Sequence, residues 1–277
     1  MDVVLGNLPT IFALIATGVF AGLLAGLLAG LLGVGGGIVI VPVLYFLFQS
    51  FGISAQSAML IATATSLATI IPTSLSSIKS HHNKGNVDFN LLKAWGAFIF
   101  IGVIIGSLLV TQYGGQWLSA LFGGIAILSA LNMLLRTNKT SVAESLPGKM
   151  GQRVMASGIG FFSAMVGIGG GTFSVPILTA YSYNAHKAVG TAAGIGLIIS
   201  LPAATMMLLL GTTPKDAPFG TYGLVNLLGF ICIVPLTVFF APMGAKLANI
   251  MDANLLKKVF SVVLLITGLR MLAQLFM

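Results

Sequence analysis

The sequence predicts an all-α polytopic membrane protein built from two inverted-topology repeats. Hydrophobic residues make up 57% of the 277 positions and charged residues only 6%. Residues 3–78 carry no formal charge, which is long enough for more than two spans of roughly 20 residues. One glycine motif also occurs twice. A water-facing surface cannot be built from this composition, so lipid is the predicted solvent.

The glycine motif marks the two repeats. Gly33-Val-Gly-Gly-Gly-Ile-Val-Ile-Val-Pro42 returns 134 positions later as Gly167-Ile-Gly-Gly-Gly-Thr-Phe-Ser-Val-Pro176. Duplicated halves are typical of transporters, whose binding sites lie where the two halves meet. We therefore expect a first repeat over residues 1–136, a cytoplasmic linker over 137–152 and a second, inverted repeat over 153–277.

Each repeat contains five apolar segments. In the second repeat the two segments beside the glycines are only about 24 and 20 Å long as helices, whereas the hydrocarbon core is about 30 Å thick. We therefore expect about three full spans per repeat, plus a pair of short helices broken at the glycines or a re-entrant hairpin. The expected segments are 8–32, 38–50, 54–78, 91–112 and 117–136, then 153–168, 172–184, 187–211, 222–245 and 255–276.

Basic residues indicate the orientation of the chain. They gather near residues 79–93, 136–153 and 246–258, in three connections that five direction changes per repeat place on one side. That side is predicted to be cytoplasmic, with both termini outside. The start of the chain has no basic region typical of a signal peptide, so the first segment is expected to be retained. Basic residues scattered in this way favour membrane orientation over nucleic-acid binding.

The glycine motifs are the predicted binding site for a substrate. Lipid cannot satisfy exposed backbone groups, so successive glycines in an apolar segment indicate an opening toward protein or a water-filled cavity. Each motif precedes the start of a helix, where free N–H groups and the positive end of the helix dipole favour an anion. Close helix packing through small residues is the alternative. The candidate residues are Gly33, Gly35, Gly36, Gly37, Gly167, Gly169, Gly170 and Gly171.

Side chains in the following segment of each repeat could complete this site. Thr65, Ser66 and Thr191 are the candidate hydroxyl groups, although hydroxyls in membrane helices often bond to helix carbonyls instead. His186 and Lys187 could attract an anion at the cytoplasmic entrance, or they could simply anchor the segment as positive-inside residues.

The sequence favours a transporter without a metal, a cofactor or a coupling cation. All five acidic residues fall outside the apolar segments, so no buried carboxylate is available for a proton relay or a cation. His81 and His82 are adjacent and cannot form a helical metal pair, and Cys232 is the single cysteine. An intramembrane enzyme would need a nucleophile with a base, which the segments lack. A non-transporting accessory subunit remains an alternative.

The doubled pattern Gly-x-Gly-Gly-Gly-x-x-x-Val-Pro resembles the TauE/SafE sulfite exporter family of bacterial inner-membrane proteins. Ala62-Thr-Ala-Thr-Ser-Leu67 and Ala188-Val-Gly-Thr-Ala192 are also similar to sequences of that family. The resemblance covers nearly the whole chain and implies export of sulfite or a short organosulfonate, with uptake of thiosulfate or another small anion as the alternative. In that family a serine often follows the threonine of the second half, but here Ala192 follows Thr191. The two halves are therefore expected to contribute unequal hydroxyl groups to the site. A homo-oligomer is left open.

Overall fold

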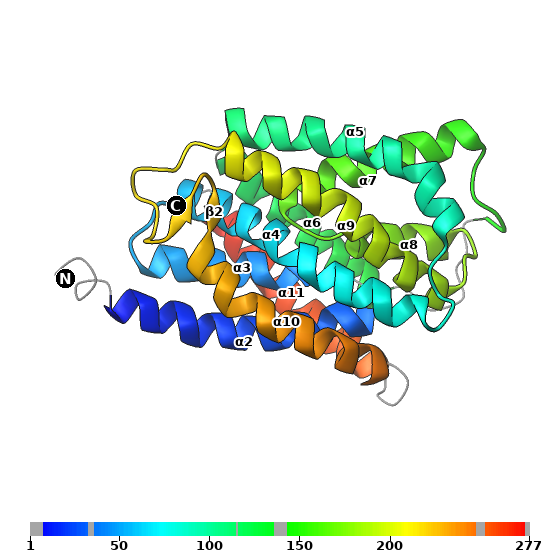
Figure 1. The fold of residues 1–277 in the computed structure, drawn as a ribbon, viewed down its shortest axis with the longest axis horizontal. Coiled ribbons are helices and arrows are strands. Elements are labelled where there is room, and N and C mark those ends of the chain that lie inside the picture. Colours follow the sequence, from blue (N-terminus) through cyan, green and yellow to red (C-terminus); the bar gives the residue numbers. More distant parts are fainter. Residues whose placement is uncertain (1–7, 33–35, 115, 136–142, 248–252, 275–277) are drawn as a thin grey trace.

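The computed structural model describes residues 8–32, 36–114, 116–135, 143–247 and 253–274. These residues form ten helices and one two-stranded hairpin (Figure 1). The helices are α2 (Leu8–Leu32), α3 (Gly37–Ser50), α4 (Ala55–His82), α5 (Phe89–Tyr113), α6 (Gln116–Leu135), α7 (Lys149–Val166), α8 (Gly171–Ala180), α9 (Ala185–Leu209), α10 (Leu227–Leu247) and α11 (Ala253–Ala273).

Within the described residues, four helices are long and apolar enough to cross a membrane, by length and composition. They are α4, α5, α9 and the Leu227–Gly244 part of α10. More than half of the apolar window is buried in α4 and in α9, so these two helices form the centre of the bundle and pack against each other. The prediction of an all-α, multi-pass membrane protein is therefore confirmed.

The helices pack in matched pairs across the two predicted repeats. Helix α2 packs on α10, and α7 packs on α5; α4 contacts α10, and α9 contacts α5. Helices α4 and α9 contact each other, as do α6 and α11. Helices α2 to α6 of the first half correspond in order to α7 to α11 of the second half. If each helix is replaced by its counterpart, the same set of contacts results. The pattern supports the predicted duplication, while the inverted topology and the boundaries at 136 and 153 stay predictions.

The second glycine motif lies at the tip of a helical hairpin formed by α7 and α8. Helix α8 has 10 residues and is about 15 Å long, half the thickness of the hydrocarbon core. The Ala143 N–H donates to the Ala180 carbonyl at 3.5 Å, and the Ser182 hydroxyl donates to the Ala143 carbonyl at 3.1 Å. The chain before α7 and the chain after α8 therefore lie at the same end of the bundle, which supports the predicted re-entrant hairpin.

Basic residues gather at one end of the bundle, which we call the basic end. Here the starts of α5, α7 and α9 meet the C-terminus of α4. The Trp95 indole donates to the Gln152 side chain at 3.0 Å, which joins α5 to α7. At the opposite end, which we call the far end, Asp216 binds the start of α4. The basic end carries Lys79, Lys84, Lys93, Lys149, Arg153, His186 and Lys187.

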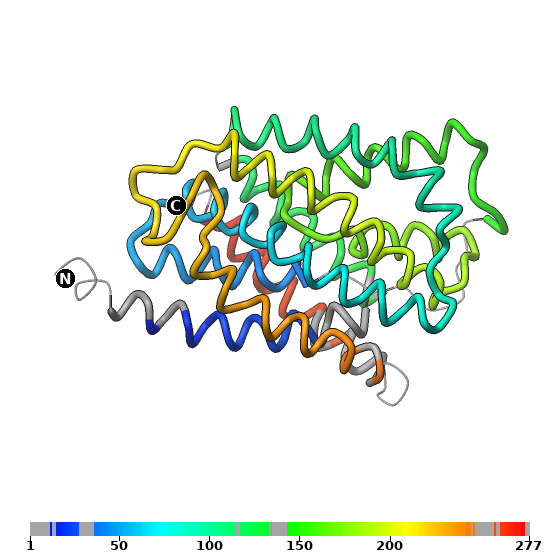
Figure 2. The backbone as a smooth tube through the Cα atoms, viewed as in Figure 1, coloured from blue at the N-terminus to red at the C-terminus, as the bar shows by residue number. Residues whose placement is uncertain are grey.

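The connection between α9 and α10 differs from the sequence prediction. A helix was expected from residue 222, but β1 (Thr221–Tyr222) and β2 (Val225–Asn226) form an antiparallel hairpin instead. Gly223 adopts a φ of 55°, which glycine tolerates without a steric penalty. Helix α10 then begins after Asn226, whose side-chain oxygen accepts from the Gly229 N–H at 2.8 Å. Figure 2 shows this connection looping out at the far end.

Candidate substrate site

The two glycine motifs meet inside the bundle, against the middle of α4 and α9. A Cβ atom placed on Gly37 would lie 2.6 Å from the Gly167 carbonyl oxygen. Ser66 of α4 donates a hydrogen bond to the same carbonyl at 2.8 Å. A Cβ atom on Gly170 would lie 2.8 Å from the backbone nitrogen of Gly196, near the midpoint of α9. We call these five residues the glycine junction.

The local backbone conformation explains why the helices are interrupted at both glycine motifs. Gly36 precedes α3 with a φ of 75°, and Gly167 ends α7 with a φ of 74°. Glycine reaches this left-handed region freely, whereas other residues are strained there. Helices α3 and α8 start directly after the breaks, and the first N–H groups of a helix have no acceptor within it. Each break therefore brings a helix N-terminus, with its positive dipole end, to the junction.

Three buried hydroxyl groups beside the junction have no hydrogen-bond partner among the described residues. They belong to Thr63, Ser163 and Thr172. The Thr63 Cα atom would lie 2.8 Å from a Cβ atom on Gly167, while Ser163 and Thr172 lie within one turn of the second motif. A buried polar group without a partner costs about 1–3 kcal/mol. A ligand that accepts hydrogen bonds at the junction would offset this cost.

The sequence prediction did not select these three hydroxyls, although a signal for each was present. Thr63 is three residues before Ser66 and therefore shares its helix face. Ser163 is one turn before the second glycine motif, and Thr172 follows its last glycine directly. Proximity in sequence to a helix break would have found Ser163 and Thr172, and the helix face shared with Ser66 would have found Thr63.

Several predicted site residues come together at the junction. Gly37 lies beside Ser66 and the second motif, and Gly169 and Gly171 flank Gly170 within the same break. Gly36 precedes Gly37 directly, but a Cβ atom placed on it would meet Ala25 of α2. Gly33 and Gly35 lie outside the described residues.

Thr65 and Thr191 contact other parts of the fold. The Thr65 hydroxyl accepts from the Asn226 N–H at 2.9 Å, just before α10. The Thr191 hydroxyl accepts from the Asp88 N–H at 3.0 Å, just before α5. Each threonine thus holds the start of a helix in the opposite half of the chain. In this structure both hydroxyls serve packing between halves, while Ser66 alone of the three predicted hydroxyls reaches the glycine junction.

His186 and Lys187 lie at the basic end, in the first turn of α9. Both residues are exposed, and their backbone N–H groups donate to the Asn184 side chain at 3.0 and 3.1 Å. Gly196 follows about nine residues later, which is roughly 14 Å along the helix. The two side chains are therefore placed at an entrance to the bundle rather than at the junction.

Asp88 joins three segments at the basic end. One carboxylate oxygen accepts from the Tyr183 hydroxyl at 2.5 Å, and the other accepts from the Asn90 and Leu91 N–H groups at the start of α5. The Tyr183 bond, followed by the Leu91 N–H, lowers the pKa of Asp88. Burial, followed by the same bond to Asp88, raises the pKa of Tyr183. Both shifts favour a carboxylate that accepts from a neutral phenol.

Acidification should therefore destabilise the protein partly through Asp88. A carboxyl group with a lowered pKa in the folded state contributes stability above its unfolded pKa of about 4. The contribution is lost as the pH falls through the lower folded value. We expect Asp88→Asn to unfold at a lower temperature than the wild type at pH 7, and to lose less stability between pH 7 and pH 3. Thermal unfolding in detergent measures both effects.

Glu144→Gln is the matched control for this experiment, because Glu144 is an exposed carboxylate in the connection before α7. Its unfolding temperature should follow the wild type across the pH series. An Asp88→Asn variant with the same acid-induced loss as the wild type would contradict the assignment.

Helices long and apolar enough to span, a helical hairpin that returns to its own end of the bundle and a donor-rich junction at mid-bundle together indicate a multi-pass membrane protein of transporter type. The sequence matches the family described as "Sulfite exporter TauE/SafE" over residues 18–271, more than nine-tenths of the chain. The chain belongs to this family. Membership confirms the predictions of family and of a membrane transporter that is not an enzyme.

Relatives of similar length carry compatible names. A "Probable membrane transporter protein" of Haemophilus influenzae is 29% identical over 239 residues, covering 86% of this chain and 90% of the relative. A protein of the same description in Methanocaldococcus jannaschii is 28% identical, covering 87% and 88%. YunE of Bacillus subtilis, also described in this way, is 26% identical, covering 88% and 92%. No solved structure matches the chain significantly.

Proposed function

We propose that this transporter exports a small sulfur oxyanion, such as sulfite or a short organosulfonate, through the glycine junction. The observation that carries the proposal is the contact of Gly37 with the Gly167 carbonyl, halfway along the central helices. Two helix N-termini reach the same place from opposite halves of the chain. This is the arrangement by which broken helices bind anionic groups at the midplane of transporters.

The chemistry of the junction suits an anion that accepts hydrogen bonds. Its available groups are helix N–H groups and the hydroxyls of Thr63, Ser163 and Thr172, all of which can donate. Sulfite and sulfonates present several acceptor oxygens on one sulfur atom. Neutral donors also hold an anion less tightly than a fixed cation would. Moderate binding suits transport, because the ligand must both enter and leave.

The proposed setting is the bacterial inner membrane, with the basic end in the cytoplasm and both termini outside. The positive-inside rule supports this orientation, because the basic residues gather at one end. His186 and Lys187 would then face the compartment from which an exported anion enters.

Ligand-dependent stability and flux test the function directly. We would measure thermal unfolding of the purified protein with sulfite, sulfate, thiosulfate and short sulfonates. A ligand present at 100 times its Kd adds about 2.7 kcal/mol to the free energy of unfolding. Sulfite or a sulfonate should raise the unfolding temperature by a few degrees, more than sulfate does. A response only to unrelated solutes would exclude the proposed substrate class.

Flux through the purified protein in proteoliposomes separates a transporter from an accessory subunit. We expect release of loaded sulfite or sulfonate with this chain as the sole protein. Binding without flux would favour the accessory subunit, and flux of thiosulfate alone would favour the thiosulfate permease.

A further inference from the structure

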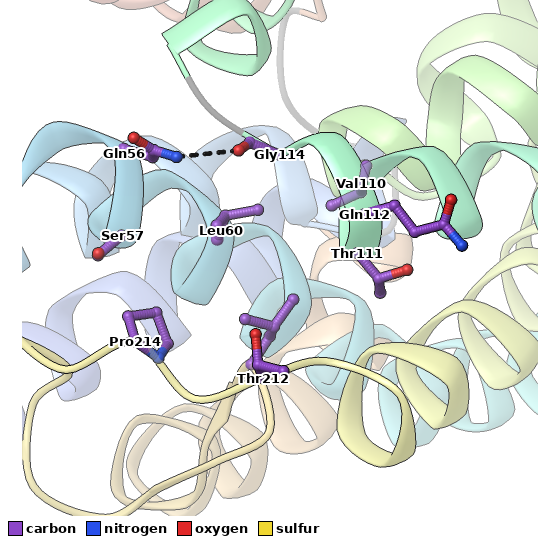
Figure 3. Close-up of a pocket in the computed structure, with 10 residues that line it drawn as sticks. Gln56, Ser57, Leu60, Val110, Thr111, Gln112, Gly114, Thr212 and Pro214 are labelled. Atoms are coloured by element: carbon purple, nitrogen blue, oxygen red, sulfur yellow. Dashed lines mark hydrogen bonds between the residues drawn. The ribbon is translucent and has the colours of Figure 1, made fainter.

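A cavity of about 280 Å³ opens at the far end of the bundle (Figure 3). Its walls come from the first turns of α4, the last turn of α5 and the connection between α9 and α10. The exposed side chains at its rim are polar, whereas Val110 and Leu224 in its lining are buried and apolar. The lining residues are Gln56, Ser57, Leu60, Val110, Thr111, Gln112, Gly114, Thr212, Pro214 and Leu224.

One face of α4 connects this cavity to the glycine junction. Gln56, Leu60, Thr63 and Ser66 are spaced by four, three and three residues, so they follow one another along the same side of the helix. Gln56 and Leu60 line the cavity, while Thr63 and Ser66 contact Gly167. The inner part of the cavity is therefore about one helical turn, roughly 5 Å, from the proposed binding site.

We propose that this cavity is an outer vestibule, a second binding station for the transported oxyanion on its way out. In this scheme Leu60, Val110 and Leu224 form an apolar barrier between the vestibule and the glycine junction. The inference rests on the proposed function, because it assigns the same ligand to a second place along the same helix face.

The polar groups of the vestibule suit weak binding of an anion. Gln112 and Thr212 carry neutral amide and hydroxyl donors, which can bind sulfur oxyanions without a fixed positive charge. The Thr111 hydroxyl in the same wall donates to the Leu108 carbonyl at 3.0 Å. The Asp216 carboxylate lies next to the vestibule, where it accepts from the Ser57 hydroxyl at 2.6 Å. Its negative charge opposes long residence of an anion. A weak binding site of this kind would release the anion to the outside rather than retain it.

A single-cysteine experiment tests the vestibule. Cys232 is the only cysteine, so Cys232→Ser combined with Thr111→Cys leaves one thiol. A membrane-impermeant sulfonated maleimide is added from outside, removed, and followed by measurement of sulfite or sulfonate efflux. The maleimide forms a thioether, which sulfite does not cleave. We expect labelling to lower efflux about tenfold relative to the same unlabelled variant, because the adduct occupies the pathway.

Tyr113→Cys in the same background is the matched control. Tyr113 is two residues further along α5, is 66% exposed and does not line the cavity, so labelling there should leave efflux unchanged. Complete labelling of Thr111→Cys with unchanged efflux would overturn the proposal, as would reaction only from inside. If Thr111→Cys is not recovered folded, Thr212→Cys on the other wall carries the same test. Failure of the unlabelled Cys232→Ser parent to carry any sulfur oxyanion would instead overturn the proposed function and, with it, the ligand of the vestibule.

Thiol reactivity tests the barrier without measuring transport. A thiol at Thr63→Cys lies beyond Leu60, so an external maleimide should react with it slowly in the Cys232→Ser background. Adding Leu60→Ala should raise the reaction rate about tenfold, because it opens the apolar layer to water. Equal rates with and without Leu60→Ala would show that Leu60 is not a barrier.

Discussion

Replacing Gly37 with valine should abolish transport while the protein still inserts into the membrane. A Cβ atom at this position would lie 2.6 Å from the Gly167 carbonyl and 2.9 Å from the Ser66 hydroxyl oxygen. Valine adds two further methyl groups, so the two glycine breaks must separate and the junction must change shape. Such overpacking typically costs about 1–3 kcal/mol, which a multi-pass bundle can tolerate. Flux in proteoliposomes and membrane content measure the two effects separately.

Gly124→Val is the control for this substitution. Gly124 lies in α6, where an added Cβ atom would meet nothing within 4 Å. This variant should insert and transport like the wild type. Gly170→Val should behave like Gly37→Val, since its Cβ atom would lie 2.5 Å from the Ile195 side chain and 2.8 Å from the Gly196 nitrogen. Full transport by both junction variants would leave the glycines with a packing role alone.

The helices could be predicted from the sequence because their signals are local. Uninterrupted apolar runs define α4, α5 and α9, and the structure places their ends within a few residues of the expected positions. Besides the start of α10, which lies at Leu227 rather than at 222, a local error is in α8, which ends at Ala180 rather than at 184. Ser182 has a φ of 58°, and Asn184 instead caps α9. An apolar run cannot reveal such a turn when the residues on both sides are hydrophobic.

The contacts of individual hydroxyls could not be predicted, because they join distant parts of the chain. Thr65 and Asn226 are 161 residues apart, and Thr191 and Asp88 are 103 apart. Hydroxyls in membrane helices more often bond within the protein, so the local sequence favoured packing for any single one of them and did not distinguish those that would bind a ligand. The vestibule could not be predicted for the same reason, since its walls come from three separate segments. By contrast, the repeated glycine motif predicted the meeting of its two copies, because equivalent parts of duplicated transporters converge at their interface.

The placement of the acidic residues bears on the driving force of transport. Asp88, Glu144 and Asp216, the acids within the described residues, all lie outside the helices. A hydrogen bond from Ser57 lowers the pKa of Asp216, just as the Tyr183 hydroxyl lowers that of Asp88. Both carboxylates are therefore ionised at neutral pH and are poor proton carriers. These positions support a transporter driven by the membrane potential acting on the anion.

Collapse of the membrane potential should therefore abolish concentrative export. An anion leaving a negative-inside compartment gains about 2.3 kcal/mol per charge for each 100 mV, equivalent to a concentration ratio of roughly fifty. Proteoliposomes with a potassium gradient and valinomycin set the potential, and anion accumulation on the positive side is measured. Removing the potential should leave only downhill flux. Dissipating a pH gradient at constant potential should change little, whereas loss of accumulation in that arm alone would indicate proton coupling.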